Sequence, residues 1–135
     1  MEFEGNVFWE EFKGDTMTIK RDFKGLVVGD TLTFIPLVRS RGQILDLSLA
    51  TSMLMTVKEN PDDPETAAVV QITGTYPLGE NGSQGRAEFK ISSNESINFD
   101  SDKTYYYDIQ FKFAGDLVYT SNYGTLEFIP EITRT

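Results

Sequence analysis

The sequence predicts an all-β protein, an antiparallel β-sandwich of about seven or eight strands preceded by an N-terminal arm. Two observations support this fold class. Apolar residues recur at every second position in several runs, which is the period of a half-buried strand. Turn signals rich in Gly, Pro, Asn and Asp separate these runs at short intervals, and no long run has the period of a helix.

The predicted strands follow one another along the chain, each with one apolar face. Their core-facing residues are Leu32 and Phe34, then Met53, Met55 and Val57, then Ala87, Phe89 and Ile91, then Tyr105, Tyr107, Ile109, Phe111 and Phe113, and finally Leu126 and Phe128. The alternate positions, such as Thr33 and Ile35, are expected to face water. Ala114–Gly115–Asp116 separates two of the runs and predicts a hairpin loop.

Two local signals refine the sandwich. Ser92 is followed three residues later by Glu95, a helix-start signature that predicts a single helical turn. The segment Asp102–Tyr107 matches the tyrosine corner of immunoglobulin-like sandwiches, although three consecutive tyrosines also have high strand propensity. The strand spacing also fits a small barrel, and we predict an immunoglobulin-like sandwich.

The length of 135 residues suits one core. We assign residues 25–135 to the sandwich domain and residues 1–24 to the arm and first strand. Residues 1–14 differ from the rest because they are rich in aromatic and acidic residues without period-two order.

The composition excludes several kinds of chemistry. The chain contains no His and no Cys, which rules out Ser-His-Asp and Cys-His catalysis, Fe–S clusters, haem ligation by these residues and ordinary structural zinc sites. Glycosidases that use two carboxylates need neither residue and pass this filter.

The net charge of −9 argues against nucleic acid and against anionic membranes as partners, since the few basic residues are scattered. The acidic N-terminus does not resemble a signal peptide, and no apolar run is long enough to cross a membrane. The absence of cysteine is compatible with a cytosolic origin.

Acidic groups offer little support for a metal site or an active site. Asp62, Asp63 and Glu65 lie close together and have the oxygen ligands that calcium prefers, but acids in a proline-flanked connector are usually only solvated. The pair Asp100 and Asp102 fits a turn.

The remaining acids do not suggest catalysis either. Glu10 and Glu11 are adjacent and would diverge in a strand or a helix. Glu88, Asp108 and Glu127 fall on the solvent-facing positions of their strands. We therefore predict no enzyme activity, no catalytic residues, no metal and no cofactor.

Aromatic residues outside the core pattern suggest a different site. Tyr106 falls on the polar face of its strand, while Trp9, Tyr119 and Tyr123 lie outside clear alternation. Two or three such rings, if coplanar, can form a platform for a sugar, and the alternative is ordinary strand packing.

The arm carries five large apolar residues, Phe3, Val7, Phe8, Trp9 and Phe12, which are the predicted interface residues. Such a segment must bury itself somewhere. It can pack on its own domain as an extra edge strand, or it can dock on a neighbouring subunit, and the sequence leaves both alternatives open.

The succession of segments between residues 25 and 134 also resembles a known family. The relevant segments are Gly29–Phe34, Gln43–Thr51, a methionine-bearing strand ending at Lys58 before Asp62–Pro64, Gly85–Ile91, Tyr105–Gln110 and Tyr123–Arg134. In this order they are similar to small structural proteins of tailed bacteriophages, including the N-terminal module of baseplate upper proteins and related tail, neck and head accessory proteins.

This resemblance implies a non-enzymatic virion protein, from the baseplate, tail, neck or capsid, that is assembled in the bacterial cytoplasm. Its partners would be other virion structural proteins and further copies of itself in a symmetric assembly. The alternative function is a carbohydrate-binding sandwich module for host-surface attachment.

Overall fold

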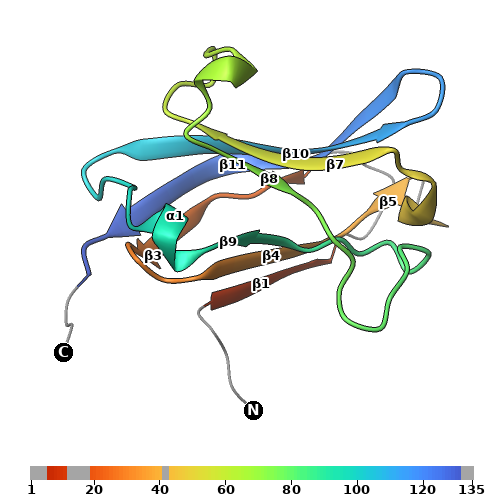
Figure 1. Ribbon diagram of the computed structural model, residues 1–135, viewed down its shortest axis with the longest axis horizontal. Coiled ribbons are helices and arrows are strands. Elements are labelled where there is room, and N and C mark those ends of the chain that lie inside the picture. Colours follow the sequence, from red (N-terminus) through yellow and green to blue (C-terminus); the bar gives the residue numbers. More distant parts are fainter. Residues whose placement is uncertain (1–5, 12–18, 41–42, 132–135) are drawn as a thin grey trace.

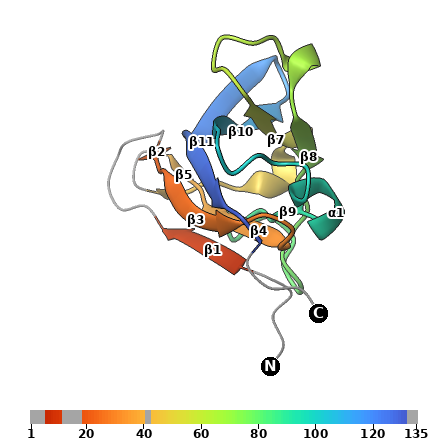
Figure 2. The ribbon, with the colours of Figure 1, turned by 90° about the vertical axis from the view of Figure 1, so that its left-hand side faces the viewer.

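The computed structural model describes residues 6–11, 19–40 and 43–131, which fold as an all-β, sandwich-like structure of two sheets (Figure 1). The larger sheet has the order β2 (Ile19–Lys20), β11 (Leu117–Ile129), β10 (Thr104–Phe113), β7 (Ser52–Lys58) and β8 (Val70–Thr73), and β3 (Phe23–Val27) also pairs with β11. The smaller sheet has the order β1 (Asn6–Glu11), β4 (Leu32–Leu37) and β9 (Phe89–Ile91). A short ribbon of β5 (Arg39–Ser40) and β6 (Gln43–Ile44), the turns η1 (Leu47–Leu49) and η2 (Glu65–Ala67), and helix α1 (Ser93–Ser96) complete the described elements. Figure 2 shows the two sheets from the side, with β1 at the margin of the smaller one.

The core lies between the two sheets and contains the residues that the alternating pattern predicts. Phe89 and Phe111 are fully buried and meet edge to face at 6.2 Å between ring centroids. Phe99 stacks on Phe128 at 4.5 Å between centroids. Burying one such side chain contributes about 1.5–3 kcal/mol. Among the predicted core residues, only Met53 and Phe113 are half-buried rather than buried.

One part of the predicted pattern is wrong. Thr33 and Ile35 were expected to face water, but they are only 7% and 5% exposed. Their strand, β4, is the central strand of the smaller sheet and has β1 and β9 on its two sides. Cross-strand neighbours on both sides shield a central strand more than alternation alone predicts.

The sheets are mixed rather than purely antiparallel. Strand β1 runs parallel to β4, and both β2 and β3 run parallel to β11. Parallel pairs need a crossover connection between the two strands. Residues 12–31 connect β1 to β4, whereas β2 and β3 pair with β11 near the other end of the chain. Gly124 allows the approach of β2 and β3, because a Cβ at this position would collide with the carbonyl group of Arg21.

The two predicted local signals are confirmed. Ser92 and Glu95 form a capping box at α1, with Ser92 N–H donating to Glu95 Oε1 at 3.0 Å and Glu95 N–H donating to Ser92 Oγ at 3.2 Å. The hydroxyl of Tyr105, near the start of β10, accepts a hydrogen bond from Asp100 N–H at 2.7 Å. A tyrosine bonded to backbone a few residues upstream at this corner is a feature of immunoglobulin-like sandwiches.

The hairpin loop is also confirmed, since residues 114–116 connect β10 to β11. Gly115 and Asp116 have φ values of 80° and 60°, a left-handed conformation that Gly and Asp tolerate well in turns.

The two sheets are joined at one side of the sandwich. Thr75, which follows β8, and Glu88, which precedes β9, exchange two backbone hydrogen bonds of 2.9 and 2.7 Å. These bonds connect the edge of the larger sheet to the edge of the smaller sheet.

Candidate functional site

Three of the predicted interface residues, Val7, Phe8 and Trp9, lie on β1. Val7, Phe8 and Trp9 stand opposite Thr33, Phe34 and Ile35 in the parallel register of β1 and β4, whereas Phe3 and Phe12 lie outside the described residues. Of the two alternatives for the arm, the structure therefore shows Asn6–Glu11 paired with the chain's own smaller sheet. Strand β1 is the last strand of that sheet, and within the described residues its outer edge has no strand partner.

A second exposed surface is the tip of the hairpin formed by β10 and β11. This tip extends away from the body of the sandwich (Figure 1). It carries Leu117 and Val118, which are 65% and 54% exposed. Strand β7 pairs with β10 only up to Lys112, so the tip lies beyond the body of the larger sheet. Because consecutive strand residues point to opposite faces, each face of this projecting tip carries one exposed apolar side chain that is available for contact with another protein.

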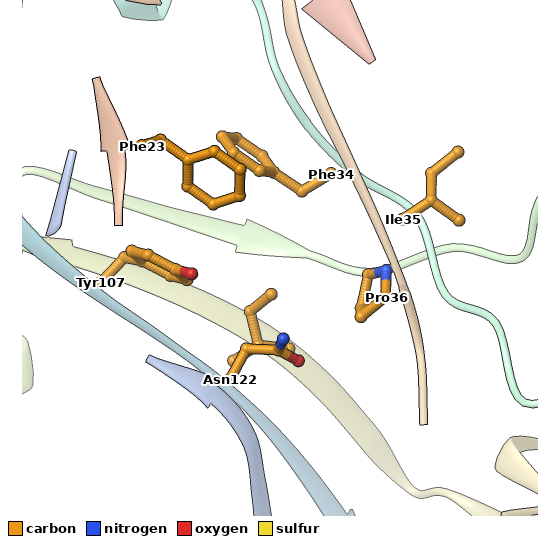
Figure 3. Close-up of a pocket in the computed structure, with 7 residues that line it drawn as sticks. Phe23, Phe34, Ile35, Pro36, Tyr107 and Asn122 are labelled. Carbon is orange, nitrogen blue, oxygen red and sulfur yellow. The ribbon is translucent and has the colours of Figure 1, made fainter. Parts of the chain in front are cut away.

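A small apolar gap lies between the two sheets (Figure 3). Its lining residues are Phe23, Phe34, Ile35, Pro36, Tyr107, Ile109 and Asn122. The gap has a volume of about 10 Å³, which is at most the space for one water molecule. We interpret it as a packing gap in the core and not as a ligand site.

A larger hollow lies on the outer face of the larger sheet. It has a volume of about 160 Å³, and its lining residues are Thr56, Lys58, Pro61, Tyr106, Tyr107, Asp108, Tyr123 and Gly124. Strands β7, β10 and β11 contribute all of these except Pro61, which belongs to the connection between β7 and β8. Figure 1 shows that this connection, which includes η2, rises over the outer face of the sheet.

The strand register explains why these side chains gather. Asp108 stands directly opposite Thr56 on one side and Tyr123 on the other. Tyr106, two residues before Asp108, shares its face and stands opposite Lys58. Tyr123 and Lys58 are each diagonal neighbours of one of these two β10 residues, within the reach of long side chains.

Asp108 has an unusual environment for a carboxylate. It is half-buried, and within the described residues its carboxylate has no hydrogen bond or salt bridge. Burial raises the pKa of Asp108 above its ordinary value of 3.8, nearby Lys58 lowers it, and Glu65 in η2 raises it. The sequence prediction that Asp108 faces water is thus correct for its face but wrong for its exposure, because the connection carrying Pro61 covers part of that face.

The four aromatic residues that lie outside the core pattern occupy three different parts of the structure. Tyr106 and Tyr123 line the same hollow, and neither hydroxyl has a hydrogen-bond partner among the described residues. Tyr119 lies elsewhere, and its hydroxyl donates to Arg39 O at 2.7 Å. Trp9 belongs to β1 at the margin of the other sheet.

Sequence reasoning missed Thr56 and Lys58 as members of this site. Thr56 is only 2% exposed although it points to the outer face, and its hydroxyl accepts a 3.4 Å hydrogen bond from Gln71 Nε2. A strand that alternates Met and Val with Thr and Lys has the pattern of an ordinary half-buried strand, so the sequence gives no signal for a site there. Only the pairing of β7 with β10 brings these two residues to Asp108.

The acidic residues do not assemble a metal centre in the described part of the chain, where no three Asp or Glu side chains gather closely enough to hold an ion. Asp62 is exposed, Asp63 is half-buried, and Glu65 lies close enough to Asp108 to raise its pKa. In the pair of Asp100 and Asp102, Asp100 Oδ1 accepts a hydrogen bond from Asp102 N–H at 2.8 Å, as expected for a turn. Glu88 and Glu127 occupy outer positions and are half-buried.

Comparison with known proteins adds no identification. No protein-family model matches this sequence, and no curated protein matches it. Among the described residues, no helix is long and apolar enough to cross a membrane.

Proposed function

We propose that this chain is a non-enzymatic structural component of a tailed-phage virion, from the baseplate, tail, neck or capsid, that works through protein–protein contacts. The observation that carries the proposal is the projecting hairpin with its exposed Leu117 and Val118. The resemblance of residues 25–134 to phage structural proteins is the reason for proposing that these contacts are made within a virion.

In this role the sandwich acts as a rigid spacer. Its two layers are held by a continuous core and are joined by the backbone bonds between Thr75 and Glu88. The hairpin tip and the outer edge of β1 supply contacts to other virion proteins and to further copies of the chain. Repeated copies in a symmetric assembly present the same surfaces many times, so small contacts suffice.

The test replaces both exposed residues of the tip by Ser, as Leu117→Ser together with Val118→Ser, in a bacterium that produces the particles. Because these side chains are exposed, the free energy of unfolding should change by no more than about 0.5 kcal/mol per substitution. Incorporation into purified particles, measured by quantitative immunoblotting, should fall strongly.

The matched control is Leu78→Ser, which removes a fully exposed leucine from a loop away from the hairpin. This variant should be incorporated normally. Normal incorporation of the double variant would contradict the role of the hairpin, and absence of the wild-type chain from purified particles would contradict the virion proposal itself.

A second candidate function is favoured by a separate observation. Tyr106 and Tyr123 line one hollow on the outer face of the larger sheet, as expected for a carbohydrate-binding module that attaches to a host surface. The test is a glycan array probed with the full chain. Reproducible binding to a defined set of glycans supports this function, and a blank array counts against it.

A further inference from the structure

We infer that the outer-face hollow binds a single pyranose ring of a neutral glycan, with Asp108 and Lys58 holding its hydroxyl groups and Tyr123 and Tyr106 flanking its apolar face. The inference rests on the second proposed function and is independent of the first.

The size of the hollow selects a small ligand. Its volume of about 160 Å³ is below the roughly 300–1,000 Å³ of pockets for drug-sized ligands. A helix, whose diameter with side chains is about 10 Å, does not fit into it. One sugar ring can enter while the rest of a glycan chain remains in solvent above the sheet.

The charges of the lining select a neutral ligand. Lys58 and Asp108 are the charged members of the lining, one cation and one anion, whose charges offset each other, while Glu65, the other nearby acid, lies outside the lining. Within the described residues neither of them forms a salt bridge, so both retain free hydrogen-bonding capacity. A half-buried carboxylate without a partner is costly, and a ligand that donates to it removes that cost.

A polyhydroxyl ring matches this set of groups better than a simple amine or a carboxylate. Its hydroxyls can donate to Asp108 and accept from Lys58 at the same time, because each hydroxyl is both donor and acceptor. The tyrosine hydroxyls of Tyr106 and Tyr123 offer further unoccupied partners.

The two tyrosine rings provide the apolar part of the site. Tyr123 stands directly across from Asp108 and is 44% exposed, so its ring is available at the rim of the hollow. Tyr106 is the diagonal neighbour of Tyr123 on the same face. An aromatic ring with a polar tip presents an apolar surface to the C–H face of a sugar and hydroxyl groups to its edge.

The experiment uses the full, isotopically labelled chain and records amide chemical shifts during titration with glucose, galactose, mannose and N-acetylglucosamine, and separately with methylammonium chloride. We expect at least one sugar to move the amides of the residues around the hollow, with millimolar affinity. Asp108→Asn should weaken that affinity by about tenfold or more, and Tyr123→Ala should also weaken it. The control Asp102→Asn, which changes an exposed carboxylate in a turn away from the hollow, should leave the affinity unchanged.

Three outcomes overturn the inference. If a sugar binds but moves amides elsewhere, the site is wrong while the carbohydrate-binding function stands. If sugar binding at the hollow persists unchanged in Asp108→Asn, the assigned contacts are wrong. If no sugar binds and methylammonium moves the same amides, the hollow is a site for organic cations, and the carbohydrate-binding function then depends on the array alone.

Discussion

Tyr105 and Tyr106 are neighbours in the sequence, but they point to opposite faces of β10. Tyr105 is 2% exposed, and its hydroxyl accepts the hydrogen bond from Asp100 N–H that fixes the corner before the strand. Tyr106 points outward into the hollow, where its hydroxyl has no partner among the described residues. The same chemical group therefore serves stability at one position and is free for a ligand at the next.

This difference predicts the effect of removing each hydroxyl. Tyr105→Phe should lower the free energy of unfolding by about 1 kcal/mol or somewhat more, because it leaves a backbone N–H without its partner. Tyr106→Phe, the matched control, should leave stability nearly unchanged. Urea unfolding of both variants tests this, and equal effects would show that the corner hydrogen bond contributes nothing specific.

Asp108 predicts a dependence on pH. Burial is the main cause that raises its pKa, so in the folded protein the ionised form is penalised relative to the unfolded chain. The penalty is fully present above the raised pKa, decreases as the pH falls through it, and vanishes below the ordinary value of 3.8.

Asp108→Asn removes this penalty, so it should raise the Tm at neutral pH, and its advantage should shrink towards zero as the pH approaches 3.8. Thermal melts of the wild type and the variant across this range provide the measurement. Asp102→Asn is the control and should show no such trend. A constant difference at every pH would mean that the substitution acts through packing and not through charge.

At the scale of elements, helix α1 shows how a very short helix is held. Four residues form only one turn, which is too short to be stable by itself. The reciprocal bonds of Ser92 and Glu95 satisfy its first N–H groups, and buried Ser96 donates a hydrogen bond to the carbonyl of Asp30, which anchors the turn to the loop before β4.

Ser92→Ala should therefore reduce stability by about 1 kcal/mol, since one orphan N–H loses its acceptor. Ser93→Ala, the exposed next residue, is the matched control and should cost little. Thermal denaturation measures both. A similar loss in the two variants would contradict the role of the capping box.

At the scale of the whole molecule, the two sides of the sandwich differ. One side is joined by backbone bonds between Thr75 and Glu88, whereas the other side ends in β1, whose pairing with β4 extends over six residues. The buried state of Ile35 depends on its place in a central strand. The arm is therefore expected to contribute to the stability of its own domain.

Deleting residues 1–11 should lower the free energy of unfolding by about 2–3 kcal/mol or more. This is the cost of exposing one large apolar side chain, and the edge of β4 becomes exposed as well. Urea unfolding of the purified chain tests this. An unchanged unfolding midpoint would mean that β1 adds nothing to the stability of the domain in solution. The alternative, that the arm docks on a neighbouring subunit, would then be favoured.

The sequence alone was enough to predict the all-β fold class, most of the core and the local capping and turn signals. Period-two patterns identified Phe89, Phe111 and most of the other core residues, because side-chain alternation is a property of each strand alone. The capping box and the hairpin loop were readable for the same reason, since their partners lie within a few residues.

Which strands are neighbours depends on the packing of the whole chain, and this packing produces the parallel pairings, the burial of Thr33 and the outer-face hollow. The hollow joins Thr56, Asp108 and Tyr123 from three strands with a long connection folded above them. Register between distant strands depends on the packing of the whole chain, so residues that look solvent-facing one strand at a time become a half-enclosed site when the sheet assembles.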